Sequence, residues 1–393
     1  MDWMINYDSL DDLQRQAVEE ISYSQDRIAW IRGYAGSGKT IILLHIIKRF
    51  LIDNPHGTVC FVTFTNALKE LAYTGLTNAE RGKITITTSC QFKSSCTRYD
   101  LVIIDEVQDC YFSDIQNASS RFNYKLIIAG DASQQIYTKR IKNNEIVNFF
   151  DNKIEEAELR IVHRLTDKIK RIATTILPTS KIVGSETPAQ QSSLKRGADA
   201  YLYKAASELD EVKGILLNIK ENPPKVSYPY AILLPNHDSI KRFIKLYIKL
   251  EGWQSNISAS EANNEDYYGE FNRGSGLLKF FGNGIGSLND SDNNPIVYIM
   301  TYHSAKGFDF EKVYIPFLDI GCFDPILRLE GEDIPDIDRK VLYVAVTRSK
   351  NDLILSYHTD KPHPYIKELV EKNLIIKADM PTTPLFDDDD DDF

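Results

Sequence analysis

The chain reads Gly33-Tyr34-Ala35-Gly36-Ser37-Gly38-Lys39-Thr40 directly after the apolar run Ile28-Ala29-Trp30-Ile31. These residues match the phosphate-binding pattern G-x-x-x-x-G-K-[ST], whose glycines let successive backbone N–H groups surround phosphate oxygens. In this pattern the lysine reaches the β- and γ-phosphates and the last hydroxyl ligates Mg²⁺. The apolar residues 41–47 predict a buried helix whose N-terminal dipole favours the anion. The sequence therefore predicts a site for a nucleoside triphosphate with magnesium, built from Gly33, Ala35, Gly36, Ser37, Gly38, Lys39 and Thr40.

A second apolar run, residues 101–104, ends in the acidic segment Asp105-Glu106-Val107-Gln108-Asp109. A carboxylate at the end of a buried strand can hold magnesium, and we assign that role to Asp105, together with Thr40. Glu106 follows this carboxylate, and we expect it to position and deprotonate the attacking water. The alternative is an ordinary solvated strand end, which the phosphate-binding loop upstream disfavours.

Strand-like runs alternate with helical stretches along the chain, which is typical of an α/β protein. Several of the expected strands end in polar residues that feed loops, as in a parallel sheet with a ligand crevice at its carboxyl edge. The expected strands cover residues 28–31, 59–64, 83–88, 101–104, 125–129, 231–234, 295–300, 312–316 and 352–357. We expect a first domain over residues 1–150, a second over 151–376 with a reduced insertion at about 254–294, and a disordered acidic tail over 377–393.

The composition is that of an ordinary globular protein, because 42% of the 393 residues are apolar and 26% are charged. Its five scattered cysteines lack a C-x-x-C pair, which argues against a disulfide framework or a Cys-ligated metal site. The chain has no apolar run of the about 18 residues that span a bilayer, and its N-terminus lacks a signal-peptide pattern. We therefore expect a cytoplasmic protein.

Six further motifs accompany the loop and the acidic strand end in a fixed order. They are Leu10–Val18, Thr63–Asn66, Gly130–Tyr137, Leu159–Arg164, Thr301–Phe310 and Leu342–Arg348. The whole set, from Leu10 to Arg348, resembles the UvrD/Rep-like branch of the superfamily 1 DNA helicases. The resemblance implies two RecA-like α/β domains with parallel sheets and ATP bound in the cleft between them. It also implies an ATP-dependent motor that moves 3′ to 5′ on single-stranded DNA.

The resemblance assigns ATP contacts to residues outside the loop. Gln14 would read the adenine edge, and Gln134 would sense the γ-phosphate. Arg164 and Arg348 would contact the phosphates from the second domain, with Arg348 in the arginine-finger position. Three alternatives stay open: Gln14 as a helix-surface residue, Arg164 as a surface salt-bridge partner, and Arg348 as a structural residue.

Two nucleotide motifs depart from the family pattern. His163 stands where the family has an aromatic residue that stacks on adenine, and it stacks less strongly. Gly307 and Asp309 lie in the motif that contacts the nucleotide sugar, where the family usually has a glutamate in place of Asp309.

The resemblance also assigns DNA contacts, to Thr63, Phe64, Asn66, Lys139 and His303. After Tyr137 the family carries a base-stacking aromatic residue, whereas this chain reads Thr138-Lys139-Arg140, so about 1–3 kcal/mol of stacking is lost. Phe64 remains a candidate stacking platform, and Lys139 and Arg140 could hold phosphates instead. For His303, a hydrogen-bonded buried histidine is an equal alternative.

The chain is short for this family. The resembled helicases carry accessory domains in the intervals that correspond to residues 67–104 and 165–300, and both intervals are reduced here. The leading hypothesis is therefore an ATP-dependent 3′–5′ translocase or helicase in DNA repair, replication or antiphage defence. The alternative is a nucleotide-gated DNA-binding subunit of a nuclease complex. Either way the expected partners are single-stranded DNA and a nuclease or repair protein, without a membrane.

The C-terminal run Asp387–Asp392, which ends in Phe393, accounts for six of the ten net negative charges. Like charges in sequence repel and stay solvated. A solubilising tail, a docking tip for a repair partner and an autoinhibitory segment over the DNA path are the three interpretations.

Overall fold

The computed structural model describes residues 4–131, 135–136, 140–151, 153–163, 165–180, 199–253, 263–282, 284–288, 290–323 and 337–381. The chain forms two compact units. The first contains residues 1–165, 177–195 and 330–347, and the second contains residues 166–176, 196–329 and 348–393. No helix in the described part of the chain is long and apolar enough to cross a membrane.

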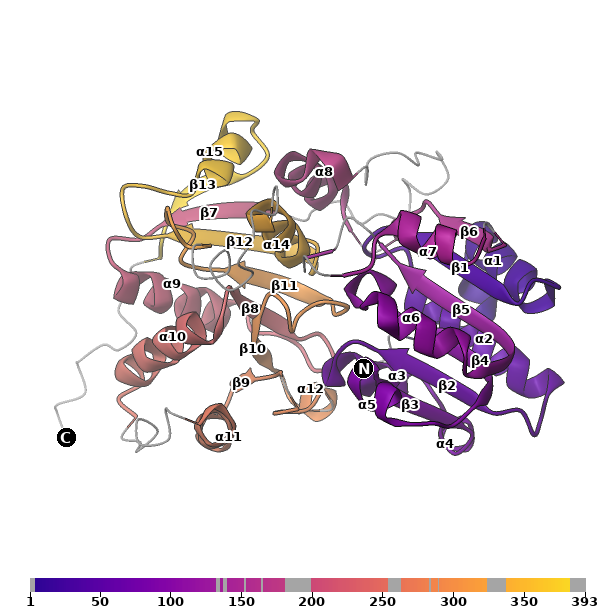
Figure 1. Cartoon of the computed structure of the whole chain (residues 1–393). Coiled ribbons are helices and arrows are strands. Elements are labelled where there is room, and N and C mark those ends of the chain that lie inside the picture. The colour runs from indigo at the N-terminus through magenta and orange to yellow at the C-terminus, as the bar shows by residue number, and fades with distance from the viewer. Residues whose placement is uncertain are drawn as a thin grey trace. The chain divides into compact units, whose positions relative to one another are not determined.

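The first unit is built on a six-stranded parallel sheet in the order β3-β2-β4-β5-β1-β6 (Figure 1). Its strands are β1 (Ile28–Gly33), β2 (Val59–Thr63), β3 (Ile84–Thr88), β4 (Tyr99–Ile104), β5 (Phe122–Gly130) and β6 (Glu155–Leu159). Its helices are α1 (Asp12–Tyr23), α2 (Lys39–Asp53), α3 (Asn66–Thr74), α4 (Asn78–Arg81), α5 (Ser89–Ser94), α6 (Phe112–Ser119), α7 (Asn143–Phe149) and α14 (Ile337–Val346). Short 3₁₀ turns lie at Tyr7–Ser9, Val107–Asp109 and Pro178–Ser180.

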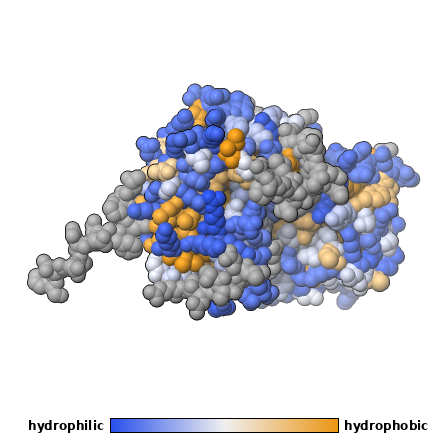
Figure 2. Space-filling model, turned by 60° about the vertical axis from the view of Figure 1, so that its left-hand side comes forward, coloured by the Kyte–Doolittle hydropathy of each residue, from blue (hydrophilic) through white to orange (hydrophobic). Residues whose placement is uncertain are grey.

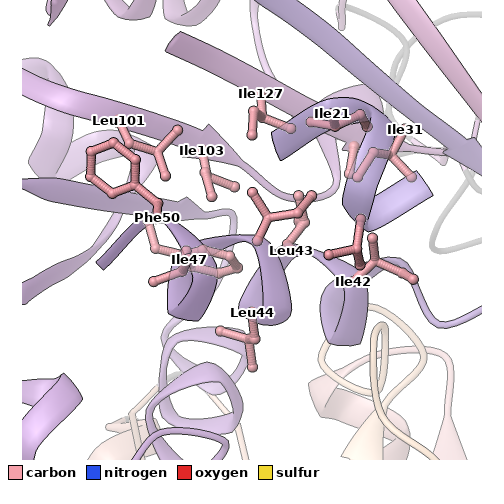
Figure 3. Packing of buried hydrophobic residues seen from close by; sticks show 14 of the residues in the cluster. Ile21, Ile31, Ile42, Leu43, Leu44, Ile47, Phe50, Leu101, Ile103 and Ile127 are labelled. Carbon is pink, nitrogen blue, oxygen red and sulfur yellow. The ribbon is translucent and has the colours of Figure 1, made fainter. Parts of the chain in front are cut away.

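Both faces of this sheet are buried. Successive residues of each strand point to opposite sides, so each strand contributes side chains to both cores. On one face, Ile31 of β1, Ile103 of β4 and Ile127 of β5 pack against α1 and α2. Figure 3 shows Leu43, Ile47 and Phe50 of α2 meeting the strand residues Leu101, Ile103 and Ile127. On the other face, Trp30 of β1 and Val102 and Ile104 of β4 pack with α5, α6 and α7. Helix α2 is therefore held along its length, which fixes the loop before it.

The second unit contains a seven-stranded sheet in the order β13-β7-β12-β11-β8-β10-β9, again with parallel pairings. Its strands are β7 (Ala200–Lys204), β8 (Tyr230–Leu234), β9 (Leu278–Phe280), β10 (Val297–Thr301), β11 (Phe310–Ile315), β12 (Ser349–Tyr357) and β13 (Ile376–Asp379). Its helices are α8 (Asp167–Ile176), α9 (Glu208–Glu221), α10 (His237–Leu250), α11 (Asn264–Gly274), α12 (Asp290–Asn293) and α15 (Pro364–Glu371).

Helices α9, α10 and α11 share one core with β8, β10 and β11. The interval 254–294, expected to hold a reduced insertion, contributes α11 and β9 to this unit. Tyr268 of α11 stacks on Phe280 of β9, with ring centroids 3.6 Å apart, and β9 pairs with β10. The described part of this interval is therefore an integral layer of the unit's core.

Two chain segments lie differently from the sequence expectation. Strand β6 pairs with β1 in the first sheet, although it follows residue 150, where the first domain was expected to end. The tail was expected to be disordered from residue 377, and this is wrong for Lys377–Asp379, which belong to the edge strand β13 and pair with β7. Edge pairing satisfies the backbone groups while leaving polar side chains exposed. The acidic run Asp387–Asp392 and Phe393 lie outside the described residues.

The surface shown in Figure 2 is mainly hydrophilic, with smaller hydrophobic areas between the polar ones. The large apolar side chains exposed on the described residues come from separate elements of both units, among them Ile52, Tyr124, Tyr228 and Ile320. Single exposed apolar residues of this kind are normal for a globular surface.

Candidate nucleotide site

The loop Gly33–Thr40 joins β1 to α2 at the carboxyl edge of the first sheet. Gly36 and Gly38 adopt φ angles of 77° and 89°, the left-handed region that side chains disfavour. A Cβ on Gly38 would also lie 2.6 Å from the Gln14 side-chain nitrogen. Lys39 folds back over the loop, and its Nζ donates hydrogen bonds to the carbonyl oxygens of Gly33 (2.9 Å) and Tyr34 (3.2 Å). The loop thus keeps the ammonium group of Lys39 beside its own backbone.

Within the loop, Ala35 and Ser37 are buried, whereas Gly33 and Gly36 are partly exposed. A Cβ on Gly33 would lie 2.4 Å from the Ser37 hydroxyl, so the loop closes tightly on itself. The predicted loop residues are therefore gathered in one compact turn.

Thr40 and Asp105 meet across the sheet edge. The Thr40 hydroxyl donates a hydrogen bond of 2.6 Å to Asp105 Oδ2, and the Glu106 N–H donates to Asp105 Oδ1 at 2.9 Å. Burial raises the pKa of the Asp105 carboxyl, and the neighbouring Glu106 charge raises it further. A hydroxyl and a buried carboxylate are oxygen ligands that suit Mg²⁺, and a cation here would offset the desolvation of Asp105. The donor set fits the expected metal.

Glu106 is buried and adopts φ 56° and ψ 47°, a left-handed conformation that is rare for a residue with a long side chain. Its carboxylate accepts a hydrogen bond from the Gln108 side-chain nitrogen. The Gln108 side-chain oxygen in turn accepts from the Asp131 N–H (3.1 Å), at the end of β5. Gln135 donates from its side chain to the Gln108 carbonyl oxygen at 3.2 Å. Gln108 therefore connects the acidic strand end to the Gly130–Tyr137 motif.

The sequence pattern assigns no role to Gln108. The signal available was an uncharged amide inside an otherwise acidic and apolar segment. Because Asp131 and Gln135 belong to the segment after a different strand, only the fold shows that Gln108 contacts them.

Gln14 belongs to α1, packs against the phosphate-binding loop and is buried. Its burial excludes the interpretation as a plain helix-surface residue. Its side-chain oxygen accepts from the Asp11 N–H (3.2 Å), and its nitrogen donates to the Ser37 carbonyl (3.0 Å). The His163 N–H donates to the Gly36 carbonyl at 3.2 Å, and its ring pairs with the Asp11 carboxylate. Burial raises the pKa of Asp11, but the hydrogen bonds from His163 and the Gln14 N–H outweigh it and lower the pKa. Asp11, to which the sequence pattern assigned no role, thus links the start of α1 to His163.

Three of the proposed DNA contacts, Thr63, Phe64 and Asn66, lie at or after the end of β2. Thr63 is buried at the end of this strand, and its hydroxyl donates to the Thr65 carbonyl oxygen (3.1 Å). Asn66 is exposed at the first position of α3. The Arg140 guanidinium carbon lies 5.4 Å from the Phe64 ring centroid and 3.6 Å from that of Tyr111. The structure therefore brings Phe64 and Arg140 together.

The motif residues of the second unit lie in the turn after β10 and at the start of β12. Burial lowers the pKa of His303 to about 4, so its ring is neutral near pH 7. Asp309 forms an ion pair with Lys350 at 3.6 Å, and Gly307 adopts a φ of 85°. Arg348 is 1% exposed, and its Nη1 donates to the Phe308 carbonyl at 3.2 Å. The structure thus ties Arg348 to the turn that carries Gly307 and Asp309.

Three predicted site residues, Gln134, Lys139 and Arg164, lie outside the described residues. Their assigned roles stay predictions. The first two belong to segments that flank the described pair Gln135 and Ile136, and Arg164 directly follows His163.

Two family models match this chain. Residues 9–197 match an AAA domain, and residues 255–360 match a UvrD-like helicase C-terminal domain. The chain thus combines an AAA domain with a UvrD-like helicase C-terminal domain, which confirms the expected resemblance to the superfamily 1 helicases. The expected fold class, two RecA-like α/β domains with parallel sheets, is confirmed by the two sheets and by these matches.

Two curated relatives share only short segments with this chain. The ATP-dependent DNA helicase PcrA of Staphylococcus aureus is 28% identical over 102 residues, which cover 23% of this chain and 14% of PcrA. A probable DNA helicase II homolog of Rickettsia conorii is 40% identical over 63 residues, which cover 16% of this chain and 10% of the relative. The aligned parts are therefore a small fraction of both helicases.

Among solved structures, the arterivirus nonstructural protein 10 helicase matches 90% of this chain and 64% of its own, with a TM-score of 0.38 and 15% identity. A likeness of that size carries no argument about function.

We expect the Gly38→Ala variant to bind nucleotide at least about tenfold more weakly. The left-handed φ and the close approach of Gln14 impose strain of about 1–3 kcal/mol, and about 1.4 kcal/mol corresponds to tenfold in a binding constant. Binding of a fluorescent ATP analogue measures the effect. The control is Gly82→Ala, because Gly82 has an ordinary helical φ and its nearest neighbour would lie 3.8 Å away. Equal affinity of both variants would show that the loop geometry at Gly38 is not required for binding.

Proposed function

We propose that this protein is an ATP-dependent motor of the UvrD type that moves 3′ to 5′ on single-stranded DNA. The observation that carries the proposal is the hydrogen bond between Thr40 and Asp105, which brings the phosphate-binding loop and the acidic strand end to one point. Gln14 and Lys39 donate hydrogen bonds to the loop, and Gln108 donates a hydrogen bond to Glu106, which follows Asp105. This is the arrangement that hydrolysis of a nucleoside triphosphate requires.

Each residue has a defined task in the proposed reaction. The loop N–H groups and Lys39 bind the phosphates, and Thr40 and Asp105 hold Mg²⁺, which supplies charge neutralisation when bound. Glu106, oriented by Gln108, positions the attacking water and accepts its proton. Arg348 stabilises charge on the phosphates, as its motif implies. Arg164 is proposed to contact the phosphates as well, and Gln134 to sense the γ-phosphate.

The DNA track is proposed to contact Thr63, Phe64 and Asn66 in the first unit and His303 in the second. Because the His303 ring is neutral near pH 7, it would act by stacking or hydrogen bonding and would not attract phosphate by charge. Phe64 and Arg140 together offer a ring and a cation, the pair that single-stranded nucleic acid binders use.

A second candidate is a nucleotide-gated DNA-binding subunit of a nuclease complex, and the structure contains one observation in its favour. The interval 67–104, which holds an accessory domain in the resembled helicases, contains only the continuation of α3, the short α4 and α5, β3 and β4. A chain without the accessory apparatus is suited to translocation or switching better than to strand separation by itself. Roles in repair, replication or antiphage defence follow from the resemblance alone.

The first experiment is steady-state ATP hydrolysis across single-stranded oligonucleotides of increasing length. A translocating motor gives stimulation that rises with length and then saturates, because longer tracks allow more steps before dissociation. Lys39→Ala is the inactive control, since it removes the cation at the phosphates. Turnover that is indifferent to DNA, or that rises only with DNA ends, would contradict translocation and favour the nucleotide-gated subunit.

We expect Gln108→Leu to lower ATP turnover by about 10- to 100-fold while nucleotide affinity changes little. The variant removes the donor to Glu106 and leaves the buried Asp131 N–H without its acceptor, so the base is no longer held in place. Turnover and ATP-analogue binding are measured on the same preparation. Gln116→Leu, an exposed glutamine on α6, serves as the matched control. Unchanged turnover in Gln108→Leu would remove Gln108 from the proposed mechanism.

We expect Arg348→Lys to reduce ATP turnover by about 10³-fold, because lysine keeps the charge but lacks the guanidinium fork. Binding of the ATP analogue should persist. Since Arg348 is buried, thermal unfolding is measured in parallel, and the exposed Arg171→Lys is the control. A folded Arg348→Lys variant with normal turnover would leave Arg348 with a structural role only.

A further inference from the structure

Three titratable side chains meet in the second unit, away from the motifs described above. Glu211 lies in the first turn of α9, Asp319 follows β11, and His358 directly follows β12. Strands β7, β12 and β11 are neighbours in the sheet, and α9 follows β7 along the chain. The cluster therefore stands at the carboxyl edge of this sheet, the edge at which α/β proteins place ligands.

The ligand-type atoms of the three side chains converge. Glu211 Oε2 lies 2.6 Å from His358 Nδ1, and Asp319 Oδ2 lies 3.2 Å from the same nitrogen. All three atoms lie within 4.8 Å of one another. Glu211 is fully buried, whereas the side chains of Asp319 and His358 are 13% and 15% exposed, so the cluster is reached from one side.

Each carboxylate is held by its other oxygen. Glu211 Oε1 accepts hydrogen bonds from the Phe317 N–H (2.7 Å) and the Ser356 hydroxyl (2.6 Å). Asp319 Oδ1 accepts from the Thr359 N–H (2.8 Å) and hydroxyl (2.7 Å), and from the His358 N–H (3.3 Å). Partners of this kind orient metal ligands in proteins, because they leave one oxygen of each carboxylate directed to the centre.

The protons of the cluster do not provide a hydrogen bond for every carboxylate oxygen in it. The proton on His358 Nδ1 is directed to Glu211, the nearer carboxylate, so the buried Asp319 Oδ2 has no hydrogen-bond donor among the described residues. Among the charged residues around it, Glu208 adds further negative charge but is itself paired with Arg242. The hydrogen bond between His358 and Glu211 raises the pKa of His358, so the protonated ring offsets part of this negative charge. The orphaned carboxylate oxygen is still costly, and a metal cation at the centre would offset that cost.

We propose that Glu211, Asp319 and His358 form a binding site for a divalent transition-metal ion, with Zn²⁺ as the best fit. Zinc takes imidazole nitrogen and carboxylate oxygen at about 2.0–2.2 Å, whereas Mg²⁺ and Ca²⁺ prefer oxygen ligands alone. A tetrahedral ion with such bonds separates its ligands by roughly 3.3 Å. The Asp319–His358 separation already matches that value, and Glu211 needs a small outward rotation. A water molecule completes the coordination from the exposed side.

The ion would cross-link three segments that are distant in sequence: the start of α9, the loop after β11 and the end of β12. It would replace the Nδ1 proton of His358, so binding releases a proton and strengthens with rising pH until the ring is fully neutral. The site is independent of the proposed ATPase activity, because none of its residues belongs to the nucleotide site.

The test uses the full chain, treated with a chelator, kept reduced and titrated with zinc chloride in calorimetry without nucleotide. We expect one equivalent that is lost in Asp319→Asn, with at least a tenfold fall in affinity. The asparagine keeps an oxygen for Thr359, so the fold is retained. The matched control is Asp360→Asn, which makes the same change at an exposed aspartate paired with Lys204 and should leave zinc affinity unchanged.

A spectroscopic measurement distinguishes this site from adventitious binding to exposed cysteines. Cobalt(II) bound by one nitrogen and oxygen ligands lacks the intense thiolate charge-transfer band, and its visible d–d bands should disappear in Asp319→Asn and in His358→Gln. Zinc should also raise the melting temperature of the wild type and of Asp360→Asn. Equal zinc affinity in Asp319→Asn and the wild type, or no zinc binding to the wild type, would overturn the proposal and leave a proton-bridged ion cluster.

Discussion

The hydrogen bond from the Thr40 hydroxyl to the Asp105 carboxylate depends on the parallel order of three strands. β1 and β4 both pair with β5 from opposite sides, with Arg32 opposite Gly130 and Ile104 opposite Ile128. The loop after β1 and the acidic end of β4 therefore emerge at the same edge. The packing of α2 against this sheet, through residues such as Leu43 and Ile47, fixes Thr40 at the start of the helix. Without the buried face of α2, the loop and the carboxylate would not be held at hydrogen-bonding distance.

The same edge carries a strained residue and the group that holds it. Glu106 adopts a left-handed conformation that costs about 1–3 kcal/mol, and such strain persists only where its surroundings determine it. Those surroundings are Gln108 and the end of β5, which close a chain of hydrogen bonds from Glu106 to Asp131. A change in the segment after Asp131 would reach Glu106 through Gln108. This gives a physical route by which events at the Gly130–Tyr137 motif could affect the proposed base.

The second sheet carries two separate groups of residues, one at the amino ends of β11 and β12 and one at their carboxyl ends. The turn after β10 carries Gly307 and Asp309 and is tied to Arg348, whereas the ends of β11 and β12 hold the Glu211–Asp319–His358 cluster. Arg348 directly precedes β12 and His358 directly follows it. The proposed metal site and Arg348 therefore lie at opposite ends of this strand, which is adjacent to β11. A cross-link at the carboxyl end of β12 would stiffen the strand that begins directly after Arg348.

The sequence by itself determined the phosphate-binding loop, the acidic strand end, the order of the motifs and the central strands, because each is a local pattern of apolar runs and polar ends. It missed β6, β7, β9 and β13. β6 reads Glu155-Glu156-Ala157-Glu158-Leu159, and it becomes a strand only because β1 offers it an edge. Tertiary structure alone decided the partners of Gln108 and Asp11 and the meeting of Glu211 with His358. Those contacts join strands and helices that are distant in sequence, and parallel crossovers, which no local pattern encodes, bring them together.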